Sequence, residues 1–184
     1  MNIMLQNLGD DRWTQPLPFL VEQLERLPRG SALDLAMGLG RNAIHLARQG
    51  WTVDGVDRSP EAVQKAMALA GSMGVHVNGI VADLGTYEIR PSSYDLICCF
   101  YFLERRLFPA IQQGLRPGGA VLYQSVTIDQ LALRPAFPRE HCLEPNELLT
   151  GFQDLRVLYY REAVVNILGT DAAVASLFAV KETG

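Results

Sequence analysis

The chain has 184 residues, of which 48% are hydrophobic and 20% are charged, and its net charge is −4. A chain of this length and composition is expected to form one globular domain, which buries roughly 70% of the surface of its unfolded state. The 16 Lys and Arg residues are outnumbered by 20 Asp and Glu residues and form no basic stripe. This balance argues against a nucleic-acid partner.

The cysteines and the apolar runs indicate where the protein works. Three cysteines are too few for a disulfide framework, and two of them, Cys98 and Cys99, are adjacent. Residues 1–11 lack the basic segment and the apolar core of a secretory signal. The longest apolar run, 96–103, is far shorter than the ~20 residues that cross a bilayer. We therefore expect a cytoplasmic protein with no membrane partner.

Apolar periodicity predicts an alternation of helices and strands in the first two thirds of the chain. An amphipathic helix is expected over 17–27, and Gly50 and Gly74 follow two later helices as stop signals. Strands are expected at 32–36, 52–56, 75–81, 94–100 and 120–126, and helices at 40–49, 60–72 and a segment ending at 113. The strands are almost continuously apolar, as in a parallel sheet that helices cover on both faces.

The last third of the chain has a different pattern. Residues 127–145 are rich in Pro, Arg and polar side chains, and a short helix is expected near Glu147. Two β-rich runs, 154–165 and 173–181, are joined by a segment too short for a crossover helix, so they must pair antiparallel. The predicted fold is α/β: a doubly wound, mostly parallel seven-stranded sheet with an antiparallel C-terminal hairpin and helices on both faces.

A glycine-rich loop after the first predicted strand indicates a cofactor site. Gly38 and Gly40 separate a strand that contains an acid, Asp34, from a predicted helix. Glycines let the backbone approach a ligand, and the helix N-terminus presents unpaired N–H groups and the positive end of its dipole. A strand-to-helix turn uses glycines without a ligand too, so the prediction rests on the whole constellation.

Two cofactors fit this loop. The glycine spacing up to Ala43 matches the dinucleotide fingerprint, and Asp57 ends the second strand as a ribose-binding acid would. That interpretation predicts an NAD(P)-dependent oxidoreductase. Three features disagree with it: Asp34 inside the first strand, a further acid, Asp83, after the third strand, and a terminal antiparallel pair without a separate substrate domain.

The stretch Asp34-x-Ala36-x-Gly38-x-Gly40 resembles the first motif of the class I S-adenosylmethionine-dependent methyltransferases, an acid followed by alternating small residues. It departs from that pattern in having alanine at position 36, where the family often has glycine. The following Arg41-Asn42 pair is similar to the small methyltransferases related to the tellurite-resistance and thiopurine methyltransferases. Further matching stretches are 57–60, 82–84, 94–97, 116–119 and the terminal hairpin.

The resemblance covers roughly residues 17–182 and implies a Rossmann-like fold that binds S-adenosylmethionine and releases S-adenosylhomocysteine. It divides the single expected domain, 1–184, into an N-terminal segment and helix (1–30), a cofactor-binding core (31–126), a substrate-side loop (127–145) and a C-terminal helix and hairpin (146–184). The expected activity is transfer of a methyl group to a small-molecule acceptor by in-line displacement. A protein that binds S-adenosylmethionine without catalysis is an alternative.

The resemblance also implies roles for individual residues. Asp34 lies near the methionine end of the cofactor, Asp57 accepts from the ribose hydroxyls, and Asp83 accepts from the adenine amino group beside the backbone N–H of Leu84. The alternatives are that Asp57 caps a helix, although Ser59 is the better cap and leaves Asp57 free, and that Asp83 is a turn acid. The expected cofactor-binding residues are Asp34, Ala36, Gly38, Gly40, Asn42, Asp57, Arg58, Asp83, Leu84, Cys99 and Phe100.

Candidates for the chemistry lie where the fourth and fifth strands end. Carboxyl ends of strands face the ligand crevice in an open α/β sheet, so Cys99, Phe100 and Tyr101 are expected to flank the methyl group. An aromatic face favours a sulfonium by cation–π attraction, while plain packing against the next helix explains the aromatics equally well. No Asn-Pro-Pro-aromatic stretch follows the fourth strand, so the chain is a poor match to the nucleic-acid amine methyltransferases.

The segment 129–144 overhangs the same crevice and is the predicted substrate lid. The candidate catalytic residues are Tyr101, Arg139 and His141, and a solvated loop explains the last two equally well. Arg12 and Trp13 are placed to close over the cofactor. We expect no metal site, because the thiols at 98 and 99 have no histidine or thiol pair at ligand spacing. A monomer or a homodimer is expected.

Overall fold

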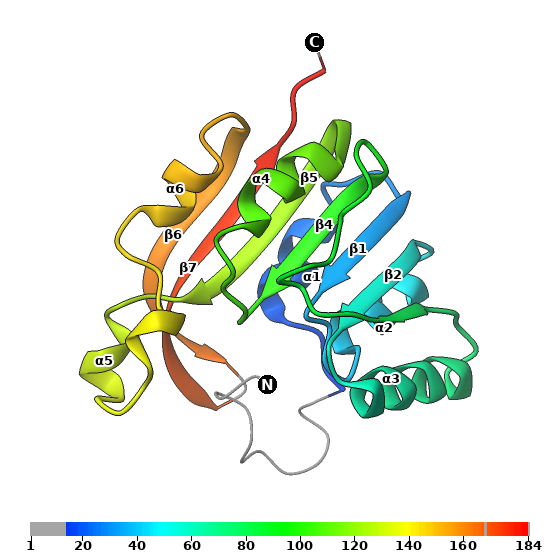
Figure 1. Ribbon diagram of the computed structural model, residues 1–184, viewed down its shortest axis with the longest axis horizontal. Coiled ribbons are helices and arrows are strands. Elements are labelled where there is room, and N and C mark those ends of the chain that lie inside the picture. The colour runs from blue at the N-terminus through cyan, green and yellow to red at the C-terminus, as the bar shows by residue number, and fades with distance from the viewer. Residues whose placement is uncertain (1–13, 168, 184) are drawn as a thin grey trace.

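The computed structural model describes residues 14–167 and 169–183. Within them, seven strands form one sheet in the order β3-β2-β1-β4-β5-β7-β6 (Figure 1). The strands are β1 (Ser31–Leu35), β2 (Thr52–Asp57), β3 (Asn78–Val81), β4 (Tyr94–Phe100), β5 (Leu115–Val126), β6 (Arg156–Ile167) and β7 (Thr170–Val180). The first five are parallel, and β7 pairs antiparallel with both β5 and β6. The predicted fold class is confirmed.

The strand order reverses at the centre of the sheet. β1 lies between β2 and β4, so the chain winds outward from β1 in one direction and then returns to build the other half. At such a switch point the connections leave to opposite sides, and a crevice opens beyond the carboxyl ends of the strands. Asp34 stands at this point, with Gly55 of β2 and Cys98 of β4 as its register neighbours.

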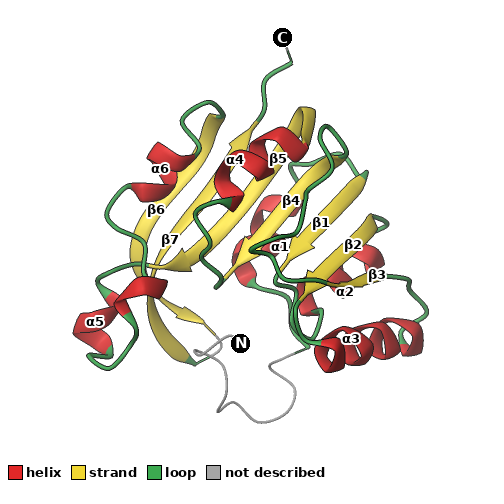
Figure 2. Cartoon of the chain, viewed as in Figure 1, coloured by secondary structure: helices red, strands yellow, loops and turns green. Residues whose placement is uncertain are grey.

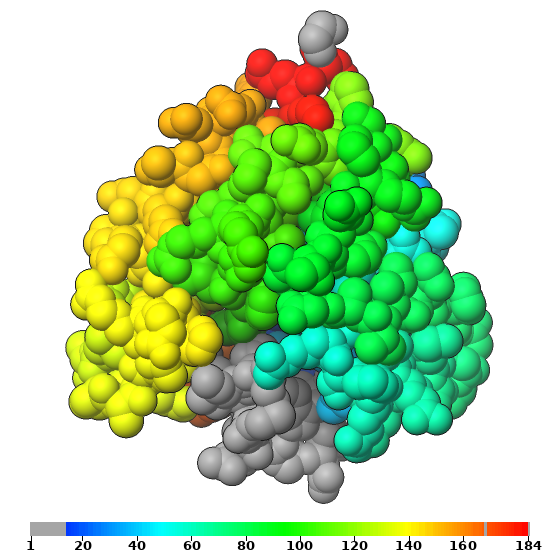
Figure 3. Space-filling model, viewed as in Figure 1, coloured from blue at the N-terminus to red at the C-terminus, as the bar shows by residue number. Residues whose placement is uncertain are grey.

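Helices cover both faces of the sheet (Figure 2). They are α1 (Pro18–Leu24), α2 (Arg41–Arg48), α3 (Pro60–Ser72), α4 (Leu107–Gly114), α5 (Gln130–Leu133) and α6 (Glu147–Gly151), with a 3-10 turn, η2, at Arg139–His141. Apolar residues of α1, α2 and α3 form one core layer with Cys98, Leu122 and Phe178 of the sheet. Residues of α4 and α6 form the second layer on the opposite face. In the view of Figure 3, α4 and its flanking segments cover the sheet.

Several predicted boundaries are wrong by a few residues, each for a local reason. The strand expected from residue 75 begins at Asn78, because the Val75 N–H turns back to bond the Ala70 carbonyl at the end of α3. The strand expected from 120 begins at Leu115, which already pairs with Tyr94 before an irregularity in the register. The helix expected over 17–27 spans Pro18–Leu24 and ends in a turn.

The C-terminal hairpin is tighter than predicted. Pairing continues to Ile167 opposite Thr170, whereas the sequence pattern left 166–172 as the connection. Asn166 stabilises the turn, because its Oδ1 accepts from the Gly169 N–H and its Nδ2 donates to Asp171. The segment 127–145, predicted as a loop, contains α5 and η2.

An aromatic cluster anchors the layer of α4 and α6. The Phe152 ring lies 5.1 Å from the Phe108 ring and 5.8 Å from the Tyr123 ring, centroid to centroid, and its side chain is fully buried. Contacts of this kind add to the free energy that the buried aromatic area contributes.

Replacing Phe152→Ala is therefore expected to lower the free energy of unfolding by about 3 to 5 kcal/mol, since it leaves a cavity among rings that cannot collapse fully. The matched control is Val164→Ala on β6, a side chain that is 55% exposed, for which a change below about 1 kcal/mol is expected. Urea unfolding monitored by circular dichroism measures both. Equal losses for the two variants would contradict the packing assigned to this cluster.

Candidate functional site

The loop from β1 to α2 adopts a backbone that few residues tolerate. Ala36, Gly38 and Gly40 all have positive φ, at 56°, 57° and 78°. A Cβ on Gly40 would lie 2.7 Å from the Cβ of Ala66 in α3, so both conformation and space require glycine there. A Cβ on Gly38 would meet no atom of the described residues within 4 Å. The loop therefore presents open space at Gly38, and Ala36 adopts its left-handed conformation at a cost of roughly 1 kcal/mol.

Asp57, at the end of β2, holds this loop. Its Oδ2 accepts from the Gly38 N–H and its Oδ1 accepts from the Ser59 N–H, both at 2.9 Å. Ser59 caps α3 as predicted, with its Oγ accepting from the Ala62 N–H at 3.2 Å. The expectation that this leaves Asp57 free is wrong, because both of its oxygens already have a partner. An ionised carboxylate offers about four acceptor sites, so it retains capacity for ligand hydroxyls.

Asp34 is a buried acid with an unsatisfied oxygen. Its side chain is 1% exposed, and its Oδ2 has no hydrogen-bond partner among the described residues. Burial raises its pKa from 3.8 to about 7, against the opposing effects of the Ala43 N–H and of the nearby Arg41 charge. Buried polar atoms are almost always paired, so an orphan oxygen beside an open glycine loop fits a cationic ligand group.

Asp83 follows β3 at the same edge of the sheet. Its Oδ1 accepts from the Gly85 N–H at 2.8 Å and its carbonyl accepts from the Tyr87 N–H at 2.8 Å, which is the turn chemistry named as the alternative to adenine binding. The side chain is exposed, and Leu84 beside it is buried. The Ala82 N–H donates to the Asp57 carbonyl at 3.0 Å, so the ends of β2 and β3 are joined.

Tyr101 directly follows β4 in a strained conformation. Its φ is +55°, a genuine outlier for a bulky residue. Two bonds to Gln124 of β5 hold it: its N–H donates to the Gln124 carbonyl at 2.8 Å, and its hydroxyl donates to Oε1 at 3.2 Å. Burial raises the pKa of the Tyr101 phenol. The phenol is therefore protonated at neutral pH and is a donor rather than a base.

The two cysteines of β4 lie in different layers. Cys98 packs with the layer of α1 to α3, next to Asp34 in the register, and Cys99 packs with the layer of α4. Cys99 is fully buried, its Sγ lies 3.7 Å from the Phe102 carbonyl oxygen, and burial raises its pKa to about 12. Phe100 is on the side of Asp34 and Cys98.

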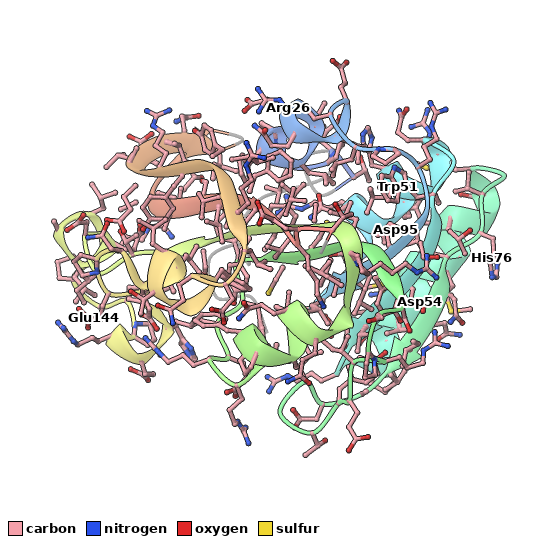
Figure 4. All side chains as sticks on the ribbon, turned by 90° about the horizontal axis from the view of Figure 1, so that it is seen from above. Arg26, Trp51, Asp54, His76, Asp95 and Glu144 are labelled. Atoms are coloured by element: carbon pink, nitrogen blue, oxygen red, sulfur yellow. The ribbon has the colours of Figure 1, made fainter. Side chains whose placement is uncertain are left out.

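Two of the predicted catalytic residues lie on the segment that follows β5. Arg139 and His141, both on η2, are exposed, and the Arg139 guanidinium pairs with Glu144 at 2.8 Å. Figure 4 shows the labelled Glu144 on the opposite side of the molecule from Asp54 and Asp95.

The remaining predicted positions have simpler outcomes. Arg58 is exposed. Asn42 uses its Oδ1 to accept the Leu17 N–H at 3.0 Å, which ties the start of α1 to α2. Arg12 and Trp13 lie outside the described residues.

Sequence reasoning missed two polar residues on this side of the sheet. Gln124 and Ser176 are 5% and 6% exposed, and the Gln124 Nε2 donates to the Ser176 Oγ at 2.7 Å. The signal was present, since each is a polar side chain inside an otherwise apolar strand. Such residues need a partner within the fold, but the pairing of β5 with β7 joins positions 52 apart in sequence.

Neither a metal centre nor a membrane-spanning helix is found in the part of the chain that the structure describes. In 14–167 and 169–183, no group of three His, Cys, Asp or Glu side chains is arranged to hold a metal ion. None of the helices in these residues has the length and apolar character needed to cross a bilayer.

A parallel sheet with this strand order, an antiparallel last strand pair and a glycine loop at the switch point define the class I methyltransferase fold. Comparison with known proteins agrees. Residues 32–119 match the family model described as a methyltransferase domain. Hemagglutinin 1 of Eikenella corrodens is 30% identical over 158 residues, which are 82% of this chain and 52% of that protein.

Two further matches carry methyltransferase names. Ubiquinone biosynthesis O-methyltransferase of Pectobacterium carotovorum is 28% identical over 116 residues, 60% of this chain and 48% of that protein. An S-adenosylmethionine-dependent methyltransferase from Clostridium acetobutylicum has a similar structure, with a TM-score of 0.74, 15% identity and coverage of 99% of this chain and 96% of that one. The chain spans about half the length of the curated relatives it matches.

The chain therefore has the fold of the class I S-adenosylmethionine-dependent methyltransferases, and its residues 32–119 are similar to a methyltransferase domain. The resemblance found in the sequence is confirmed, and S-adenosylmethionine is the cofactor that this family implies.

Asp34 gives the protein without cofactor a pH-dependent stability. Its pKa is about 7 in the folded state and near 3.8 in the unfolded state, so between these values the folded state keeps a proton that the unfolded state has lost. This contribution is complete below about pH 4 and is lost as the pH rises toward 7, by up to roughly 4 kcal/mol. In Asp34→Asn, which is neutral at every pH, it is absent.

We expect the free energy of unfolding of the wild type, relative to Asp34→Asn, to fall between pH 4 and pH 7. Urea titrations of both proteins at several pH values measure the difference and cancel the contributions of the other carboxylates. Parallel pH profiles would show that Asp34 is ionised in the folded protein throughout this range.

Proposed function

We propose that the protein transfers the methyl group of S-adenosylmethionine to a small-molecule acceptor by in-line displacement. The observation that carries the proposal is the strained, open glycine loop at the sheet switch point, beside a buried Asp34 oxygen that has no hydrogen-bond partner in 14–167 and 169–183. A helix of eight residues, α2, begins directly after this loop. Together they supply an acid for a cationic group and backbone N–H groups for an anionic one.

The residues of this edge fit the parts of S-adenosylmethionine. Asp34 would hold the amino group of the methionine moiety, and the open space beside Gly38 would admit the part of the ligand that lies against the loop backbone. Asp57 would accept from the ribose hydroxyls with the acceptor capacity that its two backbone bonds leave. Asp83 would serve the adenine amino group with its second oxygen. The bound cofactor supplies an activated methyl group on a sulfonium.

The chain's own contribution to the reaction is mainly alignment and exclusion of water. Holding two reactants in line is worth several kcal/mol without any proton transfer. Tyr101 is a protonated, buried donor fixed to Gln124, so it positions and shields the reacting groups. A base is needed only if the acceptor must lose a proton, and His141 on η2 is the candidate for that step.

Two observations support a small-molecule acceptor. The net charge of −4 and the dispersed basic residues are unsuited to a nucleic-acid substrate. The relative from Pectobacterium carotovorum carries a name that places it in ubiquinone biosynthesis as an O-methyltransferase. A hydroxyl-bearing small molecule is therefore the acceptor class to test first.

Calorimetric titration of the purified protein with S-adenosylmethionine, S-adenosylhomocysteine and NAD(H) tests the cofactor. We expect micromolar binding of the two sulfur nucleotides and none of NAD(H). Asp57→Ala is expected to weaken their binding tenfold or more, because it removes the ribose acceptor and the brace on Gly38. Asp154→Ala, at an exposed position before β6, is the control and should bind normally. Binding of NAD(H) alone would overturn the proposal in favour of an oxidoreductase.

Substitution of Gly38 separates strain from ligand contact. Gly38 and Gly74 have similar φ values, +57° and +70°, and a Cβ added at either position would meet no atom of residues 14–167 and 169–183 within 4 Å. Gly38→Ala and Gly74→Ala should therefore each cost about 1 kcal/mol of stability. Only Gly38→Ala should weaken S-adenosylhomocysteine binding, by tenfold or more. Equal binding by the two variants would remove Gly38 from the cofactor site.

A further inference from the structure

A cavity of about 160 Å³ lies between α1 and the C-terminal hairpin in the described part of the chain. Gln124 of β5 and Ser176 of β7 supply polar groups to its wall. Phe19 of α1 and Tyr159 of β6 form an aromatic side, with ring centroids 5.5 Å apart. The fold leaves this space because α1 is only seven residues long and covers part of the sheet face.

The polar groups of the cavity lie in one row across the sheet. Phe100 of β4 is the register partner of Gln124 on β5, which is in turn the register partner of Ser176 on β7. Ser176 is also the register partner of Arg161 on β6. Register partners point to the same face, so this row continues the line of Phe100 toward the edge of the sheet. The row therefore connects the end of β4, where the methyl group is expected, to the cavity.

The cavity is also at the correct end of the sheet. Val126, the last residue of β5, pairs with Val174 near the start of β7, and Val174 lines the cavity. Figure 1 shows the end of β6 and the start of β7 at the same edge as the carboxyl ends of β4 and β5. Adjacent strands are about 4.8 Å apart, so Gln124 stands one strand spacing from Phe100 and Ser176 two.

The chemistry of the row defines what it can hold. Tyr101 donates to the Gln124 Oε1, and the Gln124 Nε2 donates to the Ser176 Oγ. This chain of bonds leaves the Ser176 hydroxyl its own proton to donate, and the chain stays neutral throughout. A neutral polar group next to aromatic side chains suits a ligand with an apolar body and one hydroxyl or amine.

The volume sets the size of the ligand. A cavity of about 150 Å³ in a protein core accepts one benzene molecule, so 160 Å³ admits a single six-membered ring and no fused system. Glu22 and Arg161 line the cavity as well, and neither has an ion-pair partner among the described residues. Polar substituents of a ring would meet one charge of each sign there.

We propose that this cavity is the acceptor site, and that the methyl acceptor presents to it a single ring bearing a hydroxyl or amine held by Ser176. This inference rests on the proposed function, because it supplies the acceptor for the same cofactor edge. The acceptor site and the cofactor site can be tested separately, because the cavity residues are distinct from the loop that would bind the cofactor.

The first experiment measures binding of phenol and of toluene, two probes of equal size, to the protein saturated with S-adenosylhomocysteine. Ligand-observed NMR gives both dissociation constants. We expect phenol to bind more tightly than toluene. Ser176→Ala should weaken phenol binding threefold to tenfold, the usual effect of one hydrogen bond, and leave toluene binding unchanged. Equal affinities for the two probes in the wild type would overturn the assignment of Ser176.

The second experiment fills the cavity. Ala163 of β6 lines it, whereas its neighbour Val164 is 55% exposed and points to the opposite face. We expect Ala163→Phe to abolish phenol binding and Val164→Phe to leave it intact, with S-adenosylhomocysteine affinity unchanged in both. Phenol binding that persists in Ala163→Phe would overturn the proposal.

Calorimetry of the same variants keeps the two conclusions separate. A wild-type protein that does not bind S-adenosylhomocysteine would refute the proposed function. Normal S-adenosylhomocysteine binding, together with phenol binding that Ala163→Phe does not change, would refute the acceptor site alone. A circular dichroism spectrum of Ala163→Phe identical to that of the wild type excludes misfolding as the cause of a lost signal.

Discussion

The hydrogen bond from the Gly38 N–H to the Asp57 carboxylate joins two loops on which the candidate site depends. It links the turn after β1 to the end of β2, and the Ala82 N–H extends the connection to the end of β3 by bonding the Asp57 carbonyl. Three strand ends are thus held in one geometry by a single residue. The bond between Gly38 and Asp57 acts together with those from the Met37 N–H to the Val56 carbonyl and from the Gly40 N–H to the Met37 carbonyl, both at 3.0 Å, to hold three left-handed residues in place against the cost of their conformation.

Unfavourable features are concentrated at this edge of the sheet. Asp34 is buried with an oxygen that lacks a partner in the described part of the chain, and Ala36 and Tyr101 have positive φ. Each feature costs about a kcal/mol or more, and the apolar layers on both sides of the sheet offset the sum. Strain and unsatisfied polar groups persist in a fold when a ligand uses them, which is why their coincidence at the switch point is stronger evidence than any one of them.

The sequence predicted the architecture well, because hydrophobic periodicity and the residues that begin or end helices are local signals. Buried apolar strands, Gly50 and Gly74 after helices and the Ser59 cap all correspond to structure within a few residues. The position of the glycine loop between β1 and α2 is a local signal too. The sequence did not predict the second role of Asp57 or the row from Gln124 to Ser176, since both depend on which strands become neighbours. The backbone at Ala36 is left-handed. This explains why glycine is frequent at the same position in the family that the chain resembles.

The strand order has a consequence for the way the chain folds. β1 is complete at Leu35, but its partner β4 is 64 residues away, as the bond from the Ser31 N–H to Asp95 shows. Closing so long a loop costs entropy before the sheet contacts repay it, so the central pairing forms late and slowly. A nascent chain that ends before β4 has the glycine loop but only one wall of the crevice. Any ligand of that crevice therefore binds after the topology is complete, and it stabilises the finished fold rather than an intermediate.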